Sequence, residues 1–116
     1  MVARGQDGLL SQMRRGTLQY CVLALLADEE RYAFELVRRL SDVDGMVTSE
    51  GTIYPLLSRL RRDGLVESVW RESAEGPPRR YYHLTDRGRT ALTAFAHEWE
   101  RFRDAVDRFM EGEGAA

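Results

Sequence analysis

Residues 51–66 read GTIYPLLSRLRRDGLV, and the fold can be worked out from this stretch outward. Its apolar residues recur at helical spacing, so that one side of a helix collects Ile53, Leu56, Leu57 and Leu60. We expect the helix to run from about Thr48 or Ser49, whose hydroxyl caps it, to Asp63, with Gly64 ending it. Such a helix buries one face and presents the other.

The opposite face of this helix carries small residues and residues with hydroxyl groups, and it has no acidic residue between Gly51 and Arg62. Small residues let the backbone approach DNA base edges, hydroxyls and tyrosine reach bases or phosphates, and arginines bind backbone phosphate. The alternative is a solvated polar face, but such faces are usually rich in Glu and Lys at i,i+4 spacing. We therefore predict a DNA-contacting surface composed of Thr48, Ser49, Gly51, Thr52, Tyr54, Pro55, Ser58, Arg59 and Arg62.

Pro55 is a difficulty for this helix. Its ring removes one backbone N–H and disfavours helical angles at Tyr54. We expect either an irregular first turn or a kink at this position, and a kink would aim the first turn into a DNA groove.

Two helices are expected before this one. The first runs from Met13 to Leu26, with a weak point at Gly16 that would move its start to Thr17. The second runs from Tyr32 to Leu40, and residues 42–46 form a turn that contains a glycine.

A β-hairpin is expected after the third helix. Residues 65–72 (LVESVWRE) and 79–84 (RRYYHL) predict two strands, joined by SAEGPP at 73–78 in a loop longer than the tightest types. The pattern leaves two alternatives for the buried face of the first strand, Leu65 with Val69 or Val66 with Trp70. Three helices followed by a hairpin indicate a winged helix-turn-helix, whose third helix enters the major groove of DNA.

The last helix carries a heptad pattern that requires a partner. Thr85 caps it, it reaches about Met110, and the tail EGEGAA is expected to fray. Apolar residues recur at spacings of 3 and 4, which define a seam of Leu92, Phe95, Trp99, Phe102, Val106 and Phe109. The simplest partner is the same helix of a second copy, aided by residues 9–13; the alternative is that the seam packs on its own domain. A two-fold dimer would place two recognition helices about 34 Å apart.

Length and composition allow one domain and exclude several classes of protein. At 116 residues the chain has no apolar run that reaches the roughly 18 residues of a membrane span. Cys21 is the single cysteine, so an internal disulfide is excluded and a reducing cytoplasm is favoured. The net charge of −2 is not that of a basic nucleic-acid binder, but residues 48–84 carry six arginines against five acids. Arginine presents a planar fork suited to phosphate and guanine.

The sequence offers no catalytic or metal-binding signature. His83 and His97 are the two histidines, and no Cys or His pair has metal-ligand spacing. Cys21 lies in an apolar run and is expected to be an inert buried thiol. We expect neither enzymatic activity nor a cofactor.

These motifs together resemble the PadR family of bacterial transcriptional regulators. The resemblance rests on GTIYPLLSRLRRDGLV at 51–66, on Trp70, on GPPRRYYHLTDRG at 76–88 and on YAFEL at 32–36, in order and at the right spacing along nearly the whole chain. Mild departures are Ala33 for glycine, Ile53 for leucine and Arg80 for lysine, and none touches the predicted recognition face. The expected fold is mainly α with a small β-hairpin: a winged helix-turn-helix over 1–84, then a dimerisation helix and frayed tail over 85–116.

The resemblance implies a homodimeric repressor that binds double-stranded DNA at a palindromic operator. GPPRRYY at 76–82 resembles the wing, in which the prolines stiffen the tip and Arg79 and Arg80 lie along a phosphate strand or minor groove. The alternative is an ordinary turn with solvent-facing arginines. Tyr82 and Leu84 would anchor the second strand to the core, with Tyr81 and His83 on the other side.

A small aromatic effector is also implied by the resemblance. Some members that sense drugs hold flat aromatic compounds between the two final helices, which here would involve Phe95, Trp99 and Phe102. Aromatic residues at heptad spacing are more often dimer core, and that is the default for Trp99.

An alternative function for the whole chain is a dimeric interaction or sensor module that does not bind DNA. Salt-dependent DNA binding distinguishes the two, because each phosphate contact releases counterions.

Overall fold

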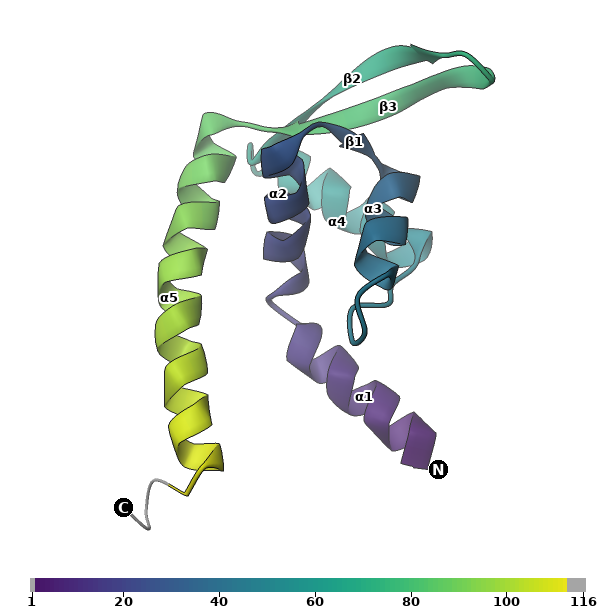
Figure 1. Ribbon diagram of the computed structural model, residues 1–116. Coiled ribbons are helices and arrows are strands. Elements are labelled where there is room, and N and C mark those ends of the chain that lie inside the picture. The colour runs from purple at the N-terminus through teal and green to yellow at the C-terminus, as the bar shows by residue number, and fades with distance from the viewer. Residues whose placement is uncertain (1, 113–116) are drawn as a thin grey trace.

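The computed structural model describes residues 2–112, with side chains from Gly8 onward. Over this range the chain forms five helices and one antiparallel sheet of strand order β1-β3-β2. The elements in chain order are α1 (Val2–Arg14), α2 (Leu18–Asp28), β1 (Arg31–Tyr32), α3 (Ala33–Ser41), α4 (Glu50–Arg62), β2 (Val66–Ser73), β3 (Gly76–Leu84) and α5 (Asp86–Met110). Figure 1 shows α2, α3 and α4 grouped beneath the sheet, while α1 and α5 leave this body as two separate projections. The predicted winged helix-turn-helix with a long C-terminal helix is confirmed.

The core lies between these three helices and the inner face of the sheet. All four apolar residues on the predicted inner face of α4 are buried, and so are Tyr82 and Leu84, which anchor β3 as expected. The remaining core side chains come mainly from α2 and α3: Val22, Leu23, Leu26, Ala33, Leu36, Leu40 and Val66. Truncating a buried leucine of this kind to alanine typically costs about 2–5 kcal/mol, so α4 is held firmly with its outer face exposed.

The N-terminal region differs from the prediction. In place of one helix from Met13 to Leu26 there are two, α1 and α2, separated at Gly16, whose φ of 86° lies in the left-handed region that a helix cannot continue through. The Thr17 hydroxyl donates to the Arg14 carbonyl oxygen at 3.0 Å and helps to close the turn. The weak point was predicted correctly, but the helix before it was missed.

The hairpin is longer and its turn tighter than predicted. Ser73 pairs with Gly76, so that residues 74–75 alone connect the strands, and the register is irregular between Arg71 and Ser73. The two prolines at 77–78 therefore lie inside β3, and not at the tip as predicted. They are tolerated there because β1 pairs with β3 only at Tyr82 and Tyr81, which leaves the far part of β3 with one neighbouring strand.

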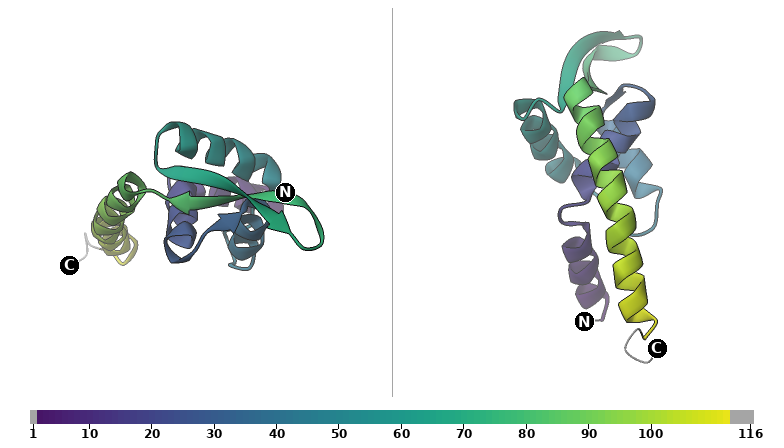
Figure 2. Two further views of the ribbon diagram at one scale, coloured as in Figure 1. Left: turned by 90° about the horizontal axis from the view of Figure 1, so that it is seen from above. Right: turned by 90° about the vertical axis from the view of Figure 1, so that its left-hand side faces the viewer.

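The buried face of β2 combines features of both alternatives. Val66 is buried, but Trp70, on the same face, is 61 % exposed because the hairpin continues past the edge of the core (Figure 2). Leu65 is half-buried and Val69 is exposed. The short strand β1, which has only two residues, was not predicted.

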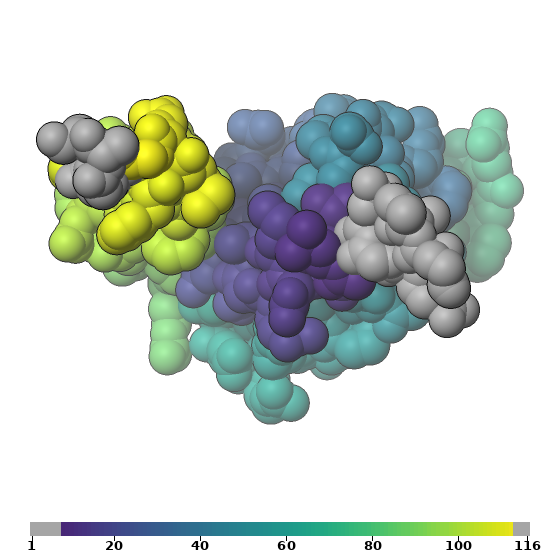
Figure 3. All heavy atoms as spheres, turned by 90° about the horizontal axis from the view of Figure 1, so that it is seen from below, coloured from purple at the N-terminus to yellow at the C-terminus, as the bar shows by residue number. Residues whose placement is uncertain are grey.

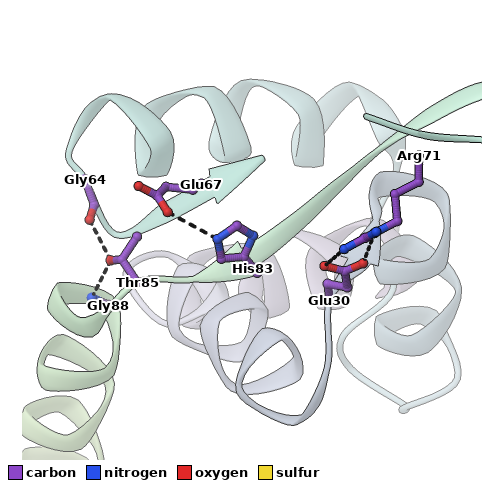
Figure 4. Close-up of polar contacts among 7 residues, drawn as sticks. All are labelled: Glu30, Gly64, Glu67, Arg71, His83, Thr85 and Gly88. Carbon is purple, nitrogen blue, oxygen red and sulfur yellow. Dashed lines mark hydrogen bonds and ion pairs between the residues drawn. The ribbon is translucent and has the colours of Figure 1, made fainter. Parts of the chain in front are cut away.

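A compact junction sets the direction of α5 (Figure 4). The Thr85 hydroxyl donates to the Gly64 carbonyl oxygen at 2.7 Å and accepts from the Gly88 backbone N–H at 3.0 Å. The Thr85 backbone N–H donates to the Leu65 carbonyl oxygen. Thr85 thus caps α5, as predicted, and ties its start to the end of α4.

The heptad seam of α5 is divided between two environments. Leu92 packs against the core, and Phe95 stacks on Tyr20 of α2 with ring centroids 4.2 Å apart and planes 6° apart. These two residues therefore contact their own domain, as the alternative for the seam expected, and the dimer interface stays a prediction. The other four side chains, Trp99, Phe102, Val106 and Phe109, are exposed.

None of the helices within residues 2–112 combines the length and apolar character needed to cross a membrane.

Candidate nucleic-acid interface

The outer face of α4 is presented as the sequence predicted. Eight of the nine predicted residues on it are exposed, and Thr48, which precedes the helix, is half-buried. Tyr54, with half of its surface exposed, is the largest of them. Two arginines make weak polar contacts: Arg59 donates to the Gln19 side chain at 3.4 Å, and Arg62 lies 3.9 Å from the Asp63 carboxylate. Both guanidinium groups remain accessible to a ligand.

Pro55 neither breaks the helix nor prevents a regular first turn. The helix is continuous from Glu50 to Arg62, and Ile53 donates to the Ser49 carbonyl oxygen at 3.0 Å in its first turn. The bond that Pro55 cannot make is the one to the carbonyl of Gly51, which is exposed, so water can satisfy that oxygen. Of the two alternatives for Pro55, the irregular first turn is therefore wrong, and the helix continues through the proline.

The start of α4 also differs in one detail. Ser49 occupies the N-cap position, but within the described part of the chain its hydroxyl makes no capping hydrogen bond. The Thr48 backbone N–H instead donates a long hydrogen bond, 3.4 Å, to the Ser41 hydroxyl in the preceding turn. The Ser49 hydroxyl is exposed on the same surface as the helix face.

Arg79 and Arg80 lie in the middle of β3 and not at the tip of the wing. Each guanidinium is stacked on an aromatic ring: Arg79 lies 4.6 Å from the centroid of Tyr32, and Arg80 lies 4.9 Å from the centroid of Trp70. Cation–π contacts at exposed sites contribute about 0.5–1 kcal/mol, enough to orient a long side chain. Both arginines line a groove of about 430 Å³ whose other wall contains Tyr54 and Ser58 of α4.

The groove between Arg79 and Arg80 on one side and Tyr54 and Ser58 on the other, hereafter the wing groove, has a positively charged lining. Among the described residues that line it there are two arginines and no acid. On the outer face of the sheet, Glu30 forms an ion pair with Arg71, and Glu67 contacts the His83 ring at 3.2 Å (Figure 4). The hydrogen bond from Arg71 lowers the pKa of Glu30, so this carboxylate stays ionised and occupied by its partner. The described lining of the wing groove therefore carries a net positive charge.

Trp70 belongs to this groove and was missed by the sequence analysis. The pattern allowed it to be a core residue, whereas it lies exposed opposite Arg80 in the hairpin register. No signal in the sequence distinguishes the two cases, because both place a tryptophan on the inner face of a strand. Its position depends on how far the hairpin extends past the helices.

The aromatic residues of α5 form a stack at a distance from α4. Phe95 and Trp99 are stacked with centroids 6.1 Å apart, and Phe102 follows Trp99 at 6.3 Å with tilted planes.

Burial raises the pKa of the Cys21 thiol, which disfavours the reactive thiolate. No group of three His, Cys, Asp or Glu side chains within the described residues is arranged to hold a metal ion.

Comparison with protein-family models matches residues 22–94 to the family described as "Transcriptional regulator PadR-like family". A transcriptional regulator of Mycobacterium tuberculosis is 38% identical over 84 residues, which are 72% of this chain and 77% of that protein. Two solved structures have similar folds. A PadR-like transcriptional regulator of Bacillus cereus has a TM-score of 0.80 and 38% identity, covering 87% of this chain and 98% of the other. A regulator of the same family from Eggerthella lenta has a TM-score of 0.82 and 33% identity, covering 97% and 99%.

Proposed function

Because the chain belongs to the PadR-like family of transcriptional regulators, we propose that it represses transcription by binding a palindromic operator as a homodimer. The observation that carries this proposal is the outer face of α4, exposed and without an acid between Gly51 and Arg62, beside the arginine-lined wing groove. A helix about 10–12 Å across fits the major groove, which is about 12 Å wide. The wing groove then receives the adjacent phosphate strand, with Arg79 and Arg80 already oriented by their aromatic partners.

The dimer is supported by surfaces that one chain cannot cover. The radius of gyration of the chain is 16.7 Å, while a compact domain of this length has about 13 Å. α5 has 25 residues, hence a length of about 38 Å, and its C-terminal half carries exposed Trp99, Phe102 and Phe109. We assign residues 1–84 to DNA binding and 85–116 to dimerisation, with residues 9–13 adding exposed Leu9, Leu10 and Met13.

Two-fold symmetry has a consequence for the operator. The paired α4 helices would reach successive turns of one face of the duplex, about 34 Å apart, which corresponds to two inverted half-sites with centres about 10 base pairs apart. Such a regulator acts in the cytoplasm, without catalytic activity or a cofactor of its own.

The direct test is a mobility-shift titration on the DNA upstream of the protein's own gene at several salt concentrations. We expect the logarithm of affinity to fall linearly and steeply with the logarithm of salt concentration, because each phosphate contact releases counterions. A flat response, or no binding even at about 50 mM salt, where electrostatic binding is strong, would instead support the interaction module that does not bind DNA.

Variants of the wing and of α4 should weaken binding in different ways. Replacing Arg79 and Arg80 with alanine removes phosphate contacts and is expected to lower affinity for all sequences similarly, with a shallower salt dependence. Tyr54→Ala or Ser58→Ala should also change the preferred sequence, because in the proposed complex these exposed side chains of α4 reach from the wing groove to base edges. Selection from a randomised DNA pool with each variant measures the difference. An unchanged affinity of the wing pair at physiological salt contradicts the role assigned to the groove.

We further propose that a flat aromatic cation, bound at the stack of Phe95, Trp99 and Phe102 between the two α5 helices, releases the operator. The stack supports this idea because an aromatic pair contributes about 0.5–1.5 kcal/mol beyond surface burial. A planar aromatic cation should quench intrinsic fluorescence in the natural protein and in Trp70→Phe, but not in Trp99→Phe. Equal quenching in the two variants, or none in the natural protein, removes the support for an effector at this site.

A further inference from the structure

A second groove, of about 640 Å³, runs along the flank of α4 that faces away from the wing. Thr48, Thr52 and Arg59 of this flank form one wall, and the junction between α1 and α2 at residues 14–16 forms the other. In the view from below (Figure 3), the purple residues of α1 lie over the blue and teal part of the chain that contains α3 and α4. The two grooves therefore lie on either side of the recognition helix.

The second groove has the chemistry of an anion site. Three arginines line it, namely Arg14, Arg15 and Arg59, and hydroxyl groups are supplied by Ser11, Thr48, Ser49 and Thr52. None of its described lining residues is acidic, although Asp and Glu outnumber the basic residues in the whole chain by 19 to 17. Arginine forks and hydroxyls are the groups that bind backbone phosphates in protein–DNA complexes.

The arginines are held at the groove by the fold. The Arg14 guanidinium donates to the Gly45 carbonyl oxygen at 2.7 Å, which ties the end of α1 to the turn before α4. Arg15, the next residue, is exposed at the groove. α1 ends at Arg14, and Arg15 and the left-handed Gly16 belong to the turn that separates it from α2.

We propose that this groove binds the DNA phosphate strand on the side of α4 opposite the wing, and that Arg15 is its main new phosphate contact. The inference rests on the proposed function, because a helix in the major groove has one phosphate strand on each side. The wing groove serves one strand, and without the second groove the other strand would meet only the flank of α4. The end of α1 and the turn that follows it thereby become part of the DNA-binding surface.

The test compares salt dependence among three variants in the full-length dimer. Each lost phosphate contact makes the slope of log affinity against log salt shallower by about 0.9, so Arg15→Ala should reduce it by about 1.8 per dimer. The loss should be the same for operator and unrelated DNA. Arg15→Lys keeps the positive charge and should retain most of the slope. Arg101→Ala, on α5 where Arg101 pairs with Glu98 at 3.0 Å, should leave the slope unchanged.

The outcomes separate this inference from the proposed function. If the natural protein binds DNA with a steep salt dependence but Arg15→Ala has the same slope, the inference is wrong and the proposed function stands. If Arg15→Ala sediments as a monomer, Arg15 acts at the subunit interface and the inference is likewise wrong. If the natural protein shows no salt-dependent DNA binding, both fail together.

Discussion

Placing aspartate at Phe102 and Phe109 is expected to convert the protein to monomers and to lower its affinity for operator DNA by about 100-fold or more. Both side chains are mostly exposed in the single chain, 62 % and 70 %, so the monomer should remain folded. In the proposed dimer the same positions lie between two apolar helices, where an unpaired carboxylate is costly to bury. Linked binding of two half-sites is then lost, which is the origin of the large effect. Sedimentation velocity and mobility shifts measure the two changes.

The matched control places aspartate at Thr90 and His97, which are exposed on the opposite side of α5 and add the same charge. These changes should preserve both the dimer and the affinity. A seam variant that remains a dimer at micromolar concentration would remove α5 from the interface. One that becomes a monomer yet binds the operator with unchanged affinity would show that the two recognition helices do not act together.

Gly88→Ala is expected to destabilise the protein by about 2–3 kcal/mol, near the upper end for a single overpacking substitution. A Cβ at this position would lie 2.1 Å from the Leu65 carbonyl oxygen and 2.7 Å from a Leu84 methyl carbon. The leucine side chain can shift, but the carbonyl accepts the Thr85 backbone N–H and cannot move without breaking the junction. Urea unfolding followed by circular dichroism, at one protein concentration, measures the loss.

Gly76→Ala provides the comparison. Nothing lies within 4 Å of the added Cβ at the start of β3, so its effect should stay within about 0.5 kcal/mol. If Gly88→Ala is as mild as Gly76→Ala, the close approach of α5 to the end of α4 does not constrain the junction. The direction of α5 would then be set by the packing of Leu92 on the core and of Phe95 on Tyr20 of α2.

The distribution of charge explains how an acidic chain can bind an acidic polymer. The net charge is −2, but phosphate binding depends on local potential within about a Debye length, roughly 8–10 Å. Both grooves beside α4 contain arginines and, among the described lining residues, no acid. Glu30 is paired with Arg71 on the outer face of the sheet.

The ion pair of Glu30 with Arg71 should make a small, pH-dependent contribution to stability. As the pH falls through the depressed pKa of Glu30, the carboxylate is protonated and this contribution is lost. The effect is small because the pair is exposed.

The elements that follow local rules were predicted closely. Helices α3, α4 and α5 begin and end within about two residues of expectation, because apolar periodicity, Gly64 and Thr85 act on their immediate neighbours. The inner and outer faces of α4 were assigned correctly from its sequence alone. The family itself was identified from ordered motifs at the right spacing and confirmed by comparison.

The arrangement of the candidate site depends on contacts between residues distant in sequence, and there the predictions were incomplete. Arg80 and Trp70 meet because the hairpin register pairs them, and Arg79 meets Tyr32 because a two-residue strand joins the sheet. The second groove exists because Gly16 separates α1 from α2 and Arg14 is bonded to Gly45, 31 positions away. The sequence by itself determined the recognition helix, its exposed face and the long C-terminal helix, since periodicity and capping are local. Only the tertiary structure decided that Arg14 and Arg15 lie beside that helix and that Arg79 and Arg80 stack on aromatic rings, since the packing of separate elements places them.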